Sequence, residues 1–227
     1  MNRLAELEQN FLEINTRIQN ACIEFGRNIE DVKLIAVTKT WPASDIRLLQ
    51  SLGLQDFGES RDQEAMAKVE ELFDLHARWH FIGQMQSNKL NHIAKYADVV
   101  HALDRQKVIT GLDAAAAKAE RRITGLLQIS LDGDESRGGV AIDGAMALAE
   151  VFSSCENLDF GGVMAVAPLA GDPDEAFSKL QTISLEIQSK YPQARMISAG
   201  MSQDLEIALK NGATHLRIGS ALLGNRA

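Results

Sequence analysis

Short apolar stretches alternate with longer amphipathic stretches along the whole chain. Eight of the apolar stretches have the length and composition of buried strands: 34–39, 54–57, 79–82, 99–102, 125–131, 160–166, 195–198 and 215–218. Apolar residues recur at helical spacing between them, over 44–51, 61–75, 86–96, 105–121, 143–154, 173–190 and 202–211, with a last helix from 220 and an opening helix within 1–19. Strict alternation with short connections predicts a parallel α/β sheet.

Eight strand–helix repeats in 227 residues favour one architecture. They are typical of a closed (β/α)8 TIM-type barrel, here with an extra N-terminal helix, and an open doubly wound sheet is the alternative. Composition does not change at any point that would mark a linker, so we expect residues 1–227 to form a single domain.

Charge and cysteine content narrow the function classes. The formal net charge is -8, which argues against nucleic acid or an anionic membrane as partner, because either would need a concentrated basic face. The opening residues are charged and amphipathic, so we expect no signal peptide and no membrane span. The two cysteines, Cys22 and Cys155, suit reduced thiols in a cytoplasmic protein, and no residue spacing indicates a metal site.

The first apolar stretch leads directly into a lysine, Lys39. Desolvating an ammonium is costly and favours the neutral amine, which is the nucleophile of Schiff-base chemistry. A lysine at the carboxyl end of a barrel strand therefore indicates a binding or catalytic group. The alternative is that Lys39 lies just beyond the strand and extends into solvent.

The turns after the last two expected strands have the composition of an anion site. Residues 198–202 (SAGMS) and 218–221 (IGSA) each combine a glycine, a hydroxyl side chain and the start of a helix. Such barrels commonly bind phosphate after strands seven and eight, although ordinary capped turns would look the same. Arg217 shares a strand face with His215, and it meets Lys39 in one cavity if both faces line the barrel interior. Otherwise Arg217 faces an outer helix and pairs with a carboxylate.

Five segments in chain order carry a family resemblance. They read AVTKT at 36–40, FGESRDQE at 57–64, WHFIGQMQSNK at 79–89, GMSQD at 200–204 and RIGSALLGNR at 217–226. Together they resemble the signatures of the pyridoxal phosphate homeostasis proteins, the YggS/PROSC family. The resemblance covers essentially the whole chain.

This resemblance implies a barrel similar to the N-terminal domain of alanine racemase, of fold type III, with pyridoxal 5'-phosphate (PLP) held as an aldimine on Lys39. It also implies a set of further cofactor-binding residues. The phosphate would be held by Ser198, Gly200, Met201, Ser202, Gly219 and Ser220, the pyridine nitrogen would face Arg217, and Ser60, His80 and Asn88 would lie near the cofactor.

Three positions depart from the family pattern. Ser60 replaces an asparagine, Arg137 replaces a lysine and Leu223 replaces a phenylalanine. The first two remove an amide and an amine that could contact the cofactor, while the lysine and the phosphate turns are unchanged.

The resemblance and the residues together predict a carrier of PLP with no catalytic residues and no robust turnover. Racemases that resemble this barrel obtain a tyrosine base from a second domain, and the only tyrosines here, Tyr96 and Tyr191, fall on expected helices and read as packing residues. We expect a cytoplasmic monomer that supplies PLP to PLP-dependent apo-enzymes. The alternatives are a Schiff-base lysine aldolase or lyase of a phosphorylated sugar and a weak amino acid racemase.

Overall fold

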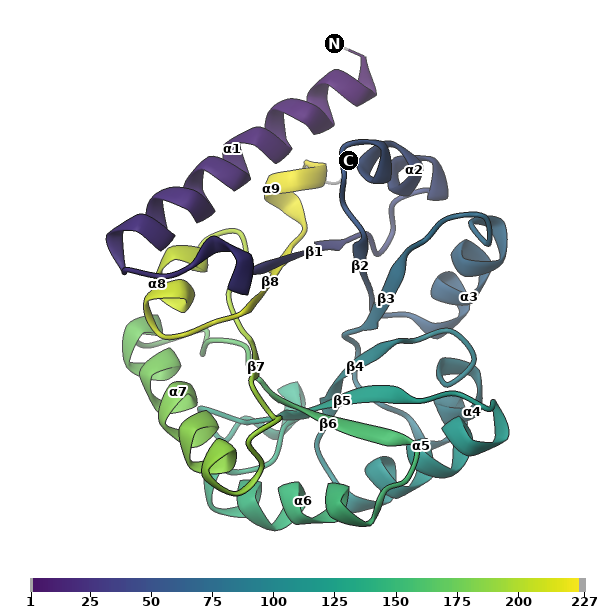
Figure 1. Cartoon of the computed structure of the whole chain (residues 1–227), viewed down its shortest axis with the longest axis vertical. Helices are drawn as coiled ribbons and strands as arrows, with labels where there is room; N and C mark the ends of the chain where they lie inside the picture. Colours follow the sequence, from purple (N-terminus) through teal and green to yellow (C-terminus); the bar gives the residue numbers. More distant parts are fainter. Residues whose placement is uncertain (1, 225–227) are drawn as a thin grey trace.

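A computed structural model, which describes residues 2–224, shows a closed barrel of parallel strands surrounded by helices (Figure 1). The strands are β1 (Lys33–Val37), β2 (Asp56–Glu59), β3 (Arg78–Phe81), β4 (Val99–Leu103), β5 (Ile123–Gln128), β6 (Leu158–Met164), β7 (Met196–Ser198) and β8 (His215–Ile218). Each strand pairs with the next along the chain, and β8 pairs with β1 from Lys33 opposite His215 to Ala36 opposite Ile218. The predicted (β/α)8 fold is confirmed, and the closing pair rules out the open sheet.

Helices form an outer ring around the strands (Figure 1). They are α1 (Arg3–Glu24), α2 (Ala43–Ser51), α3 (Asp62–Glu71), α4 (Leu90–Ile93), α5 (Gln106–Lys118), α6 (Ala145–Val151), α7 (Pro173–Lys190), α8 (Leu205–Lys210) and α9 (Ser220–Leu223). Short 3-10 helices are η1 (Ile29–Asp31), η2 (Ser87–Lys89), η3 (Glu135–Arg137), η4 (Ile142–Gly144) and η5 (Phe152–Ser154). The apolar faces of helices and strands meet in one core, which includes Phe57, Leu112 and Phe177.

Element boundaries are closest to the prediction where the sequence has a strong local signal. α7 begins after Asp172, whose side chain accepts a hydrogen bond from the N–H of Asp174, and Pro173 occupies its first turn. The helix expected over 86–96 is instead divided into η2 and α4, and bonds of the 3-10 type stand at both ends, from the N–H of Lys89 to the carbonyl of Gln86 and from the N–H of Lys95 to the carbonyl of His92.

The first strand ends two residues earlier than expected. β1 stops at Val37, and Thr38 still donates its N–H to the carbonyl of Gly58 on β2. The N–H of Trp41 then bonds the carbonyl of Thr38, and Thr40 has a φ of 68°, in the left-handed region. Lys39 therefore lies in a tight turn beyond the strand.

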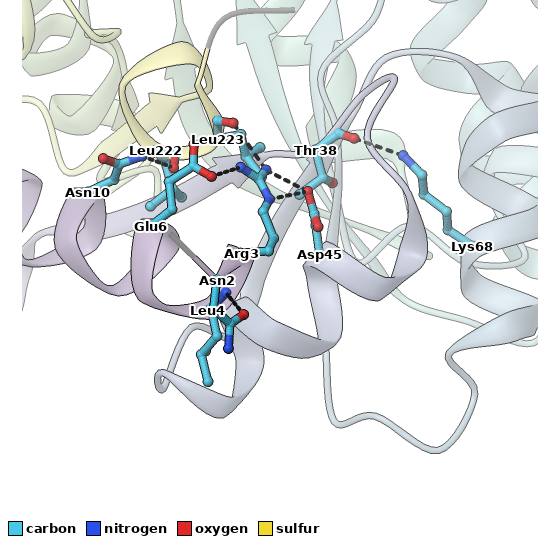
Figure 2. Close-up of polar contacts among 10 residues, drawn as sticks. All are labelled: Asn2, Arg3, Leu4, Glu6, Asn10, Thr38, Asp45, Lys68, Leu222 and Leu223. Carbon is cyan, nitrogen blue, oxygen red and sulfur yellow. Dashed lines mark hydrogen bonds and ion pairs between the residues drawn. The ribbon is translucent and has the colours of Figure 1, made fainter.

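The N-terminal helix lies outside the ring, against the last helices and α2 (Figure 1). Arg3 bonds the carboxylate of Asp45 on α2 at 2.6 Å and the carbonyl of Leu223 on α9 at 3.1 Å (Figure 2). Asn10 bonds the carbonyl of Leu222 at 2.9 Å, so α1 holds together the two ends of the barrel wall.

Two classes of feature are absent from residues 2–224. None of the helices there has the length and apolar character to cross a membrane. Within the same residues, no group of three or more histidine, cysteine, aspartate or glutamate side chains could hold a metal ion. The final letters of the last signature segment, Asn225 and Arg226, lie outside the described residues.

Candidate functional site

A cavity of about 740 Å³ opens at the carboxyl ends of the strands, where barrels of this type carry their active sites. Its volume is within the usual range for a small-molecule site. It is lined by Val37, Lys39, Trp41, Ile82, Met201, Ser202, Gln203, Asp204, Arg217, Gly219, Ser220 and Gly224. Residues from the beginning and the end of the chain therefore meet in one site.

Lys39 reaches this cavity from the turn after β1. It is half-buried, so it neither sits in the closed core nor extends fully into solvent. A lysine in this position combines a reactive amine with access for a ligand, which is what covalent chemistry with a carbonyl compound requires.

A buried ion-pair network, which we call the lysine brace, holds the turn on both sides of Lys39. The brace consists of Lys68, Glu59, Glu64 and the backbone of Thr38 and Thr40. Lys68 Nζ donates to the carbonyl of Thr38 at 2.8 Å and to Oε1 of Glu59 and of Glu64, each at 2.7 Å (Figure 2 shows the Thr38 bond). Glu64 in turn accepts the N–H of Thr40.

The brace is desolvated. Lys68 and Glu59 side chains are 8% and 1% exposed, and Glu59 also accepts the hydroxyl of Thr38 at 2.7 Å. Burial raises the pKa of Glu59 and outweighs the opposing effect of Lys68. The buried carboxylate and ammonium therefore depend on each other, and the position of Lys39 depends on both.

Arg217 lines the cavity from β8, the strand that pairs with β1. One nitrogen, Nη1, donates to the carbonyl of Ser198 at 2.7 Å and to its hydroxyl at 2.6 Å, and Nη2 donates to the carbonyl of Ala165 at 2.9 Å. Burial lowers the pKa of Arg217 to about 10, against a smaller raising effect of Asp204. A guanidinium at this pKa remains a cation at neutral pH.

The last two turns bring hydroxyl groups and backbone donors to the cavity. Ser220 Oγ lies 3.3 Å from Ser202 Oγ, which also accepts the N–H of Ala221 at 3.2 Å. The N–H of Met201 donates to Asp204 at 2.6 Å. The N–H of Met201, one of the expected phosphate donors, is therefore already paired, and its acceptor, the carboxylate of Asp204, lies in the same cavity.

Gly200 shapes the first of these turns without lining the cavity. Its φ is 90°, and a Cβ atom there would lie 2.6 Å from Cβ of Ala208 and 2.9 Å from a methyl group of Leu216. Gly200 therefore lets the turn pack tightly onto α8 and β8.

The structure brings together six of the eleven predicted site residues on the cavity wall: Lys39, Met201, Ser202, Arg217, Gly219 and Ser220. Ser198 and Gly200 lie directly behind that wall, through the contacts given above. The predicted alternative for Arg217, an outward side chain paired with a carboxylate, does not occur, since its guanidinium donates to Ser198 and Ala165 inside the barrel.

Ser60, His80 and Asn88 are not among the residues that line the cavity, and their place near the cofactor stays a prediction. His80 points down into the barrel, with Nε2 2.8 Å from Asp56, because its position in β3 faces the interior. Asn88 is exposed on η2, which turns the chain away from the cavity. Ser60 packs against Gly83, where an added Cβ would lie 2.3 Å from the Ser60 carbonyl oxygen.

Arg137, the residue at the family's lysine position, also lies elsewhere. It bonds Asp132 at 2.8 Å and the carbonyl of Ala167 at 2.7 Å, and so it holds the loop after β5 to the loop after β6. Leu223 is buried in α9.

Several cavity residues were not identified from the sequence. Trp41, Ile82 and Asp204 line the site, and each falls inside or beside a quoted motif that could have indicated it. The lysine brace had no such signal, because Lys68 follows Glu64 at a spacing of four and looks like a solvent-exposed helical pair.

The chain matches the family model described as alanine racemase, N-terminal domain, over residues 4–227. Among curated proteins it is 40% identical to a protein of Mycobacterium tuberculosis over 99% of this chain and 95% of the relative. It is 39% identical to a protein of Corynebacterium glutamicum over 94% of this chain and 99% of the relative. Both relatives are named pyridoxal phosphate homeostasis protein.

Among solved structures, the chain is similar to PipY of Synechococcus elongatus determined with PLP bound. The TM-score is 0.85 and the identity 30%, over 96% of this chain and 100% of PipY.

Proposed function

The chain belongs to the alanine racemase N-terminal domain family and, within it, to the pyridoxal phosphate homeostasis proteins, and from this we infer that it binds PLP and serves PLP homeostasis. One observation supports this most directly. Lys39 and Arg217, which are 178 positions apart by their residue numbers, line the same cavity together with the hydroxyl groups of Ser202 and Ser220.

The donor set suits PLP, which carries an aldehyde, a pyridine nitrogen and a phosphate. The amine of Lys39 would hold the aldehyde carbon covalently, and the guanidinium of Arg217 would donate to the ring nitrogen. Ser202 and Ser220, with the backbone of Gly219, would hold the phosphate. When bound, PLP can supply an electron sink for reactions of amino groups.

The roles of the nearby residues follow from their contacts. The brace holds Thr38 and Thr40 and so aims Lys39. Asp204 keeps the turn closed through the N–H of Met201, and we propose that it stays there, because a free carboxylate would repel a phosphate. Trp41 and Ile82 supply apolar surface to the same cavity.

We propose that the protein carries PLP without robust turnover. Among the described residues, the cavity wall contains neither a tyrosine nor a histidine that could act as acid or base on the opposite side from Lys39. Tyr96 is buried, and Tyr191 packs edge-on against Phe160 at a ring separation of 5.6 Å. A cationic Arg217 beside the ring nitrogen would also disfavour its protonation, which weakens the electron sink.

The proposal also covers the protein's oligomeric state, its location in the cell and its partners. We propose that the whole chain acts as one PLP-binding unit, as a monomer in the cytoplasm, and that PLP-dependent apo-enzymes receive the cofactor. Two free cysteines, Cys22 and Cys155, suit a reducing compartment.

Covalent labelling tests the proposal. Purified protein mixed with PLP and reduced with borohydride should carry one phosphopyridoxyl group, which peptide mass spectrometry should place on Lys39. Lys39→Ala should lose the label, and Lys33→Ala, a matched change at the exposed opposite end of β1, should keep it. Labelling that persists undiminished in Lys39→Ala would contradict the proposal.

The same chemistry separates the alternative functions. A Schiff-base aldolase or lyase would be trapped by borohydride only with a phosphorylated sugar, and a racemase would convert L-alanine to D-alanine at a measurable rate. We expect neither result.

A further inference from the structure

A chain of buried polar side chains, which we call the relay, crosses the barrel interior and ends at the cavity. It runs through the first residue of β2, the interiors of β3 and β4, the last residue of β7 and the interior of β8. Its members are Asp56, His80, His101, Ser198 and Arg217. Asp56 Oδ1 lies 2.8 Å from His80 Nε2, and His80 Nδ1 lies 2.9 Å from His101 Nε2. On the other side of His101, Nδ1 lies 2.9 Å from Ser198 Oγ, which lies 2.6 Å from Arg217 Nη1.

The two ends of the relay set the direction of its bonds when both histidine rings are neutral. A guanidinium has only donors, so Arg217 donates to Ser198 Oγ. The Asp56 carboxylate only accepts, so His80 donates to it from Nε2, and the lone pair on Nδ1 of a neutral His80 accepts from Nε2 of His101. Neutral His101 then has its lone pair on Nδ1, which accepts the hydroxyl proton of Ser198. All four bonds point from Arg217 to Asp56.

This direction requires both histidines to be neutral, and the surroundings of His101 favour this. Burial lowers the pKa of His101 well below its ordinary value, and the charge of Arg217 acts in the same direction. The His80 side chain is 0% exposed and its ring meets that of His101 edge-on at 5.1 Å. The relay therefore has one cation at the cavity, two neutral rings and one anion at its far end.

Asp56 is suited to be that anion. Its side chain is 15% exposed, and the exposed Arg78 is 3.7 Å away, further than His80. Desolvation alone would raise the pKa of Asp56, but the hydrogen bond from His80 and the charge of Arg78 act against it, so the pKa is lowered and the carboxylate is charged at neutral pH. Arg217, in contrast, has serine and backbone oxygens as its hydrogen-bond acceptors, and none of these is a carboxylate.

We propose that Asp56, His80 and His101 are positioning residues for the cofactor: through Ser198 they fix the orientation of the Arg217 guanidinium in the cavity, and the chain of hydrogen bonds ends on the carboxylate of Asp56. The connection to PLP depends on the proposed function, whereas the directed relay is a property of the unliganded protein. Hydrogen bonds in a low-dielectric interior polarise one another, so an anion at one end strengthens the bond at the other.

The first test observes the relay without cofactor. In 15N-labelled, PLP-free protein at pH 7.5, two-dimensional 1H–15N spectra of the histidine rings should show His80 and His101 neutral and protonated at Nε2. A proton on Nδ1 of His101, or a charged His101, would overturn the relay. Because PLP is absent, this result does not depend on the proposed function.

The second test measures the dissociation constant for PLP at the same pH. His101→Leu removes the acceptor of Ser198, so we expect about tenfold weaker binding, the size of one lost hydrogen bond to a charged group. His101→Gln can accept from Ser198 and donate to His80, and should recover part of the loss. His215→Leu is the matched control, because His215 is equally a buried barrel histidine but bonds Thr214 and stays outside the relay.

If His101 had only a structural role, PLP binding by these variants would follow a different pattern. Equal weakening in His101→Leu and His215→Leu, or no recovery in His101→Gln, would reject the positioning role. Thermal unfolding of each variant shows whether a loss of binding follows a loss of fold. Failure of the unaltered protein to bind PLP would reject the proposed function alone, since the ring spectra decide the relay independently.

Discussion

Single residues in this protein depend on partners that lie far apart in the sequence. Lys39 was predicted from a local pattern, an apolar stretch followed by a lysine, and it lines the cavity. Lys68 was not predicted, because a lysine on a short amphipathic helix usually faces solvent. Only the packing of α3 onto β2 removes Lys68 from water and pairs it with Glu59.

The lysine brace makes a strong prediction for stability. Lys68→Met should lower the free energy of unfolding by about 3 kcal/mol, because it leaves Glu59 buried without its cation. The double variant Lys68→Met, Glu59→Leu should recover more than half of that loss, since it buries no unpaired charge. Urea unfolding measures both effects.

An exposed pair provides the control for this experiment. Lys179 and Glu175 form an i,i+4 pair on the surface of α7, and Lys179→Met should change the stability by less than about 0.5 kcal/mol. A loss in Lys68→Met no larger than this would show that the brace is not coupled as the structure implies.

His215 predicts the pH dependence of stability. Burial lowers the pKa of His215 to about 4 from an ordinary value of 6.5, and the titratable groups around it are His80, Asp56, Arg78 and Lys33. Between these two values the unfolded chain binds a proton that the folded protein does not, so stability falls as the pH falls from 6.5 to 4. The loss from this residue corresponds to about 3 kcal/mol.

Urea unfolding between pH 7 and pH 4 tests this expectation. The unaltered protein should lose about 3 kcal/mol more over this range than His215→Leu, which cannot take up the proton. Parallel pH profiles for the two proteins would contradict the lowered pKa.

Whole elements were predicted more reliably than their ends. β8 and α7 match their expected bounds because alternation or a capped start marks them. The helix expected to begin at Ser44 instead begins at Ala43, with Pro42 as its N-cap. Three members of the relay, His80, Ser198 and Arg217, were predicted as separate site residues. Their connection was not predicted, because His80 and His101 are single polar residues in two strands, and only barrel closure brings them together with Ser198.

The N-terminal helix should contribute to ligand retention as well as stability. Arg3 joins α1 to α2 and α9, and its guanidinium lies 4.7 Å from the ring centroid of Trp41, which lines the cavity. Arg3→Ala should therefore destabilise the fold by about 1–2 kcal/mol and accelerate PLP dissociation several-fold. Stopped-flow measurement gives the rate of PLP dissociation.

The control is a change at a surface arginine distant from the cavity, and it shows whether the loss of any positive charge accelerates PLP dissociation. Arg122 pairs with Asp159 at 2.7 Å, and both side chains are exposed. Arg122→Ala should leave the dissociation rate unchanged. Equal rates in Arg3→Ala and the unaltered protein would show that α1 does not support the cavity wall.

At the scale of the whole molecule, the cavity exists only because the barrel closes. Its wall combines the turn after β1 with the turns after β7 and β8, and the pair of β8 with β1 that closes the barrel places the turn that carries Lys39 beside the strand that carries Arg217. The seam between β6 and β7 is the tightest part of this closure. Gly162 pairs with Met196 and has a φ of 141°, and a Cβ atom at Gly162 would lie 2.1 Å from the carbonyl oxygen of Met196.

Gly162→Ala should therefore prevent normal closure, with a loss of more than about 3 kcal/mol or no folded protein, because the backbone of β7 would have to move. Gly53→Ala is the matched change: its φ of 98° is also positive, but no atom lies within 4 Å of the added methyl group, so we expect a loss of about 1–2 kcal/mol from backbone strain alone. Urea unfolding measures both variants, and soluble yield reports on a Gly162→Ala chain that cannot fold. Similar losses in the two variants would mean that the β6–β7 seam can adjust to an added methyl group, and that the cavity does not depend on the close approach of these two strands.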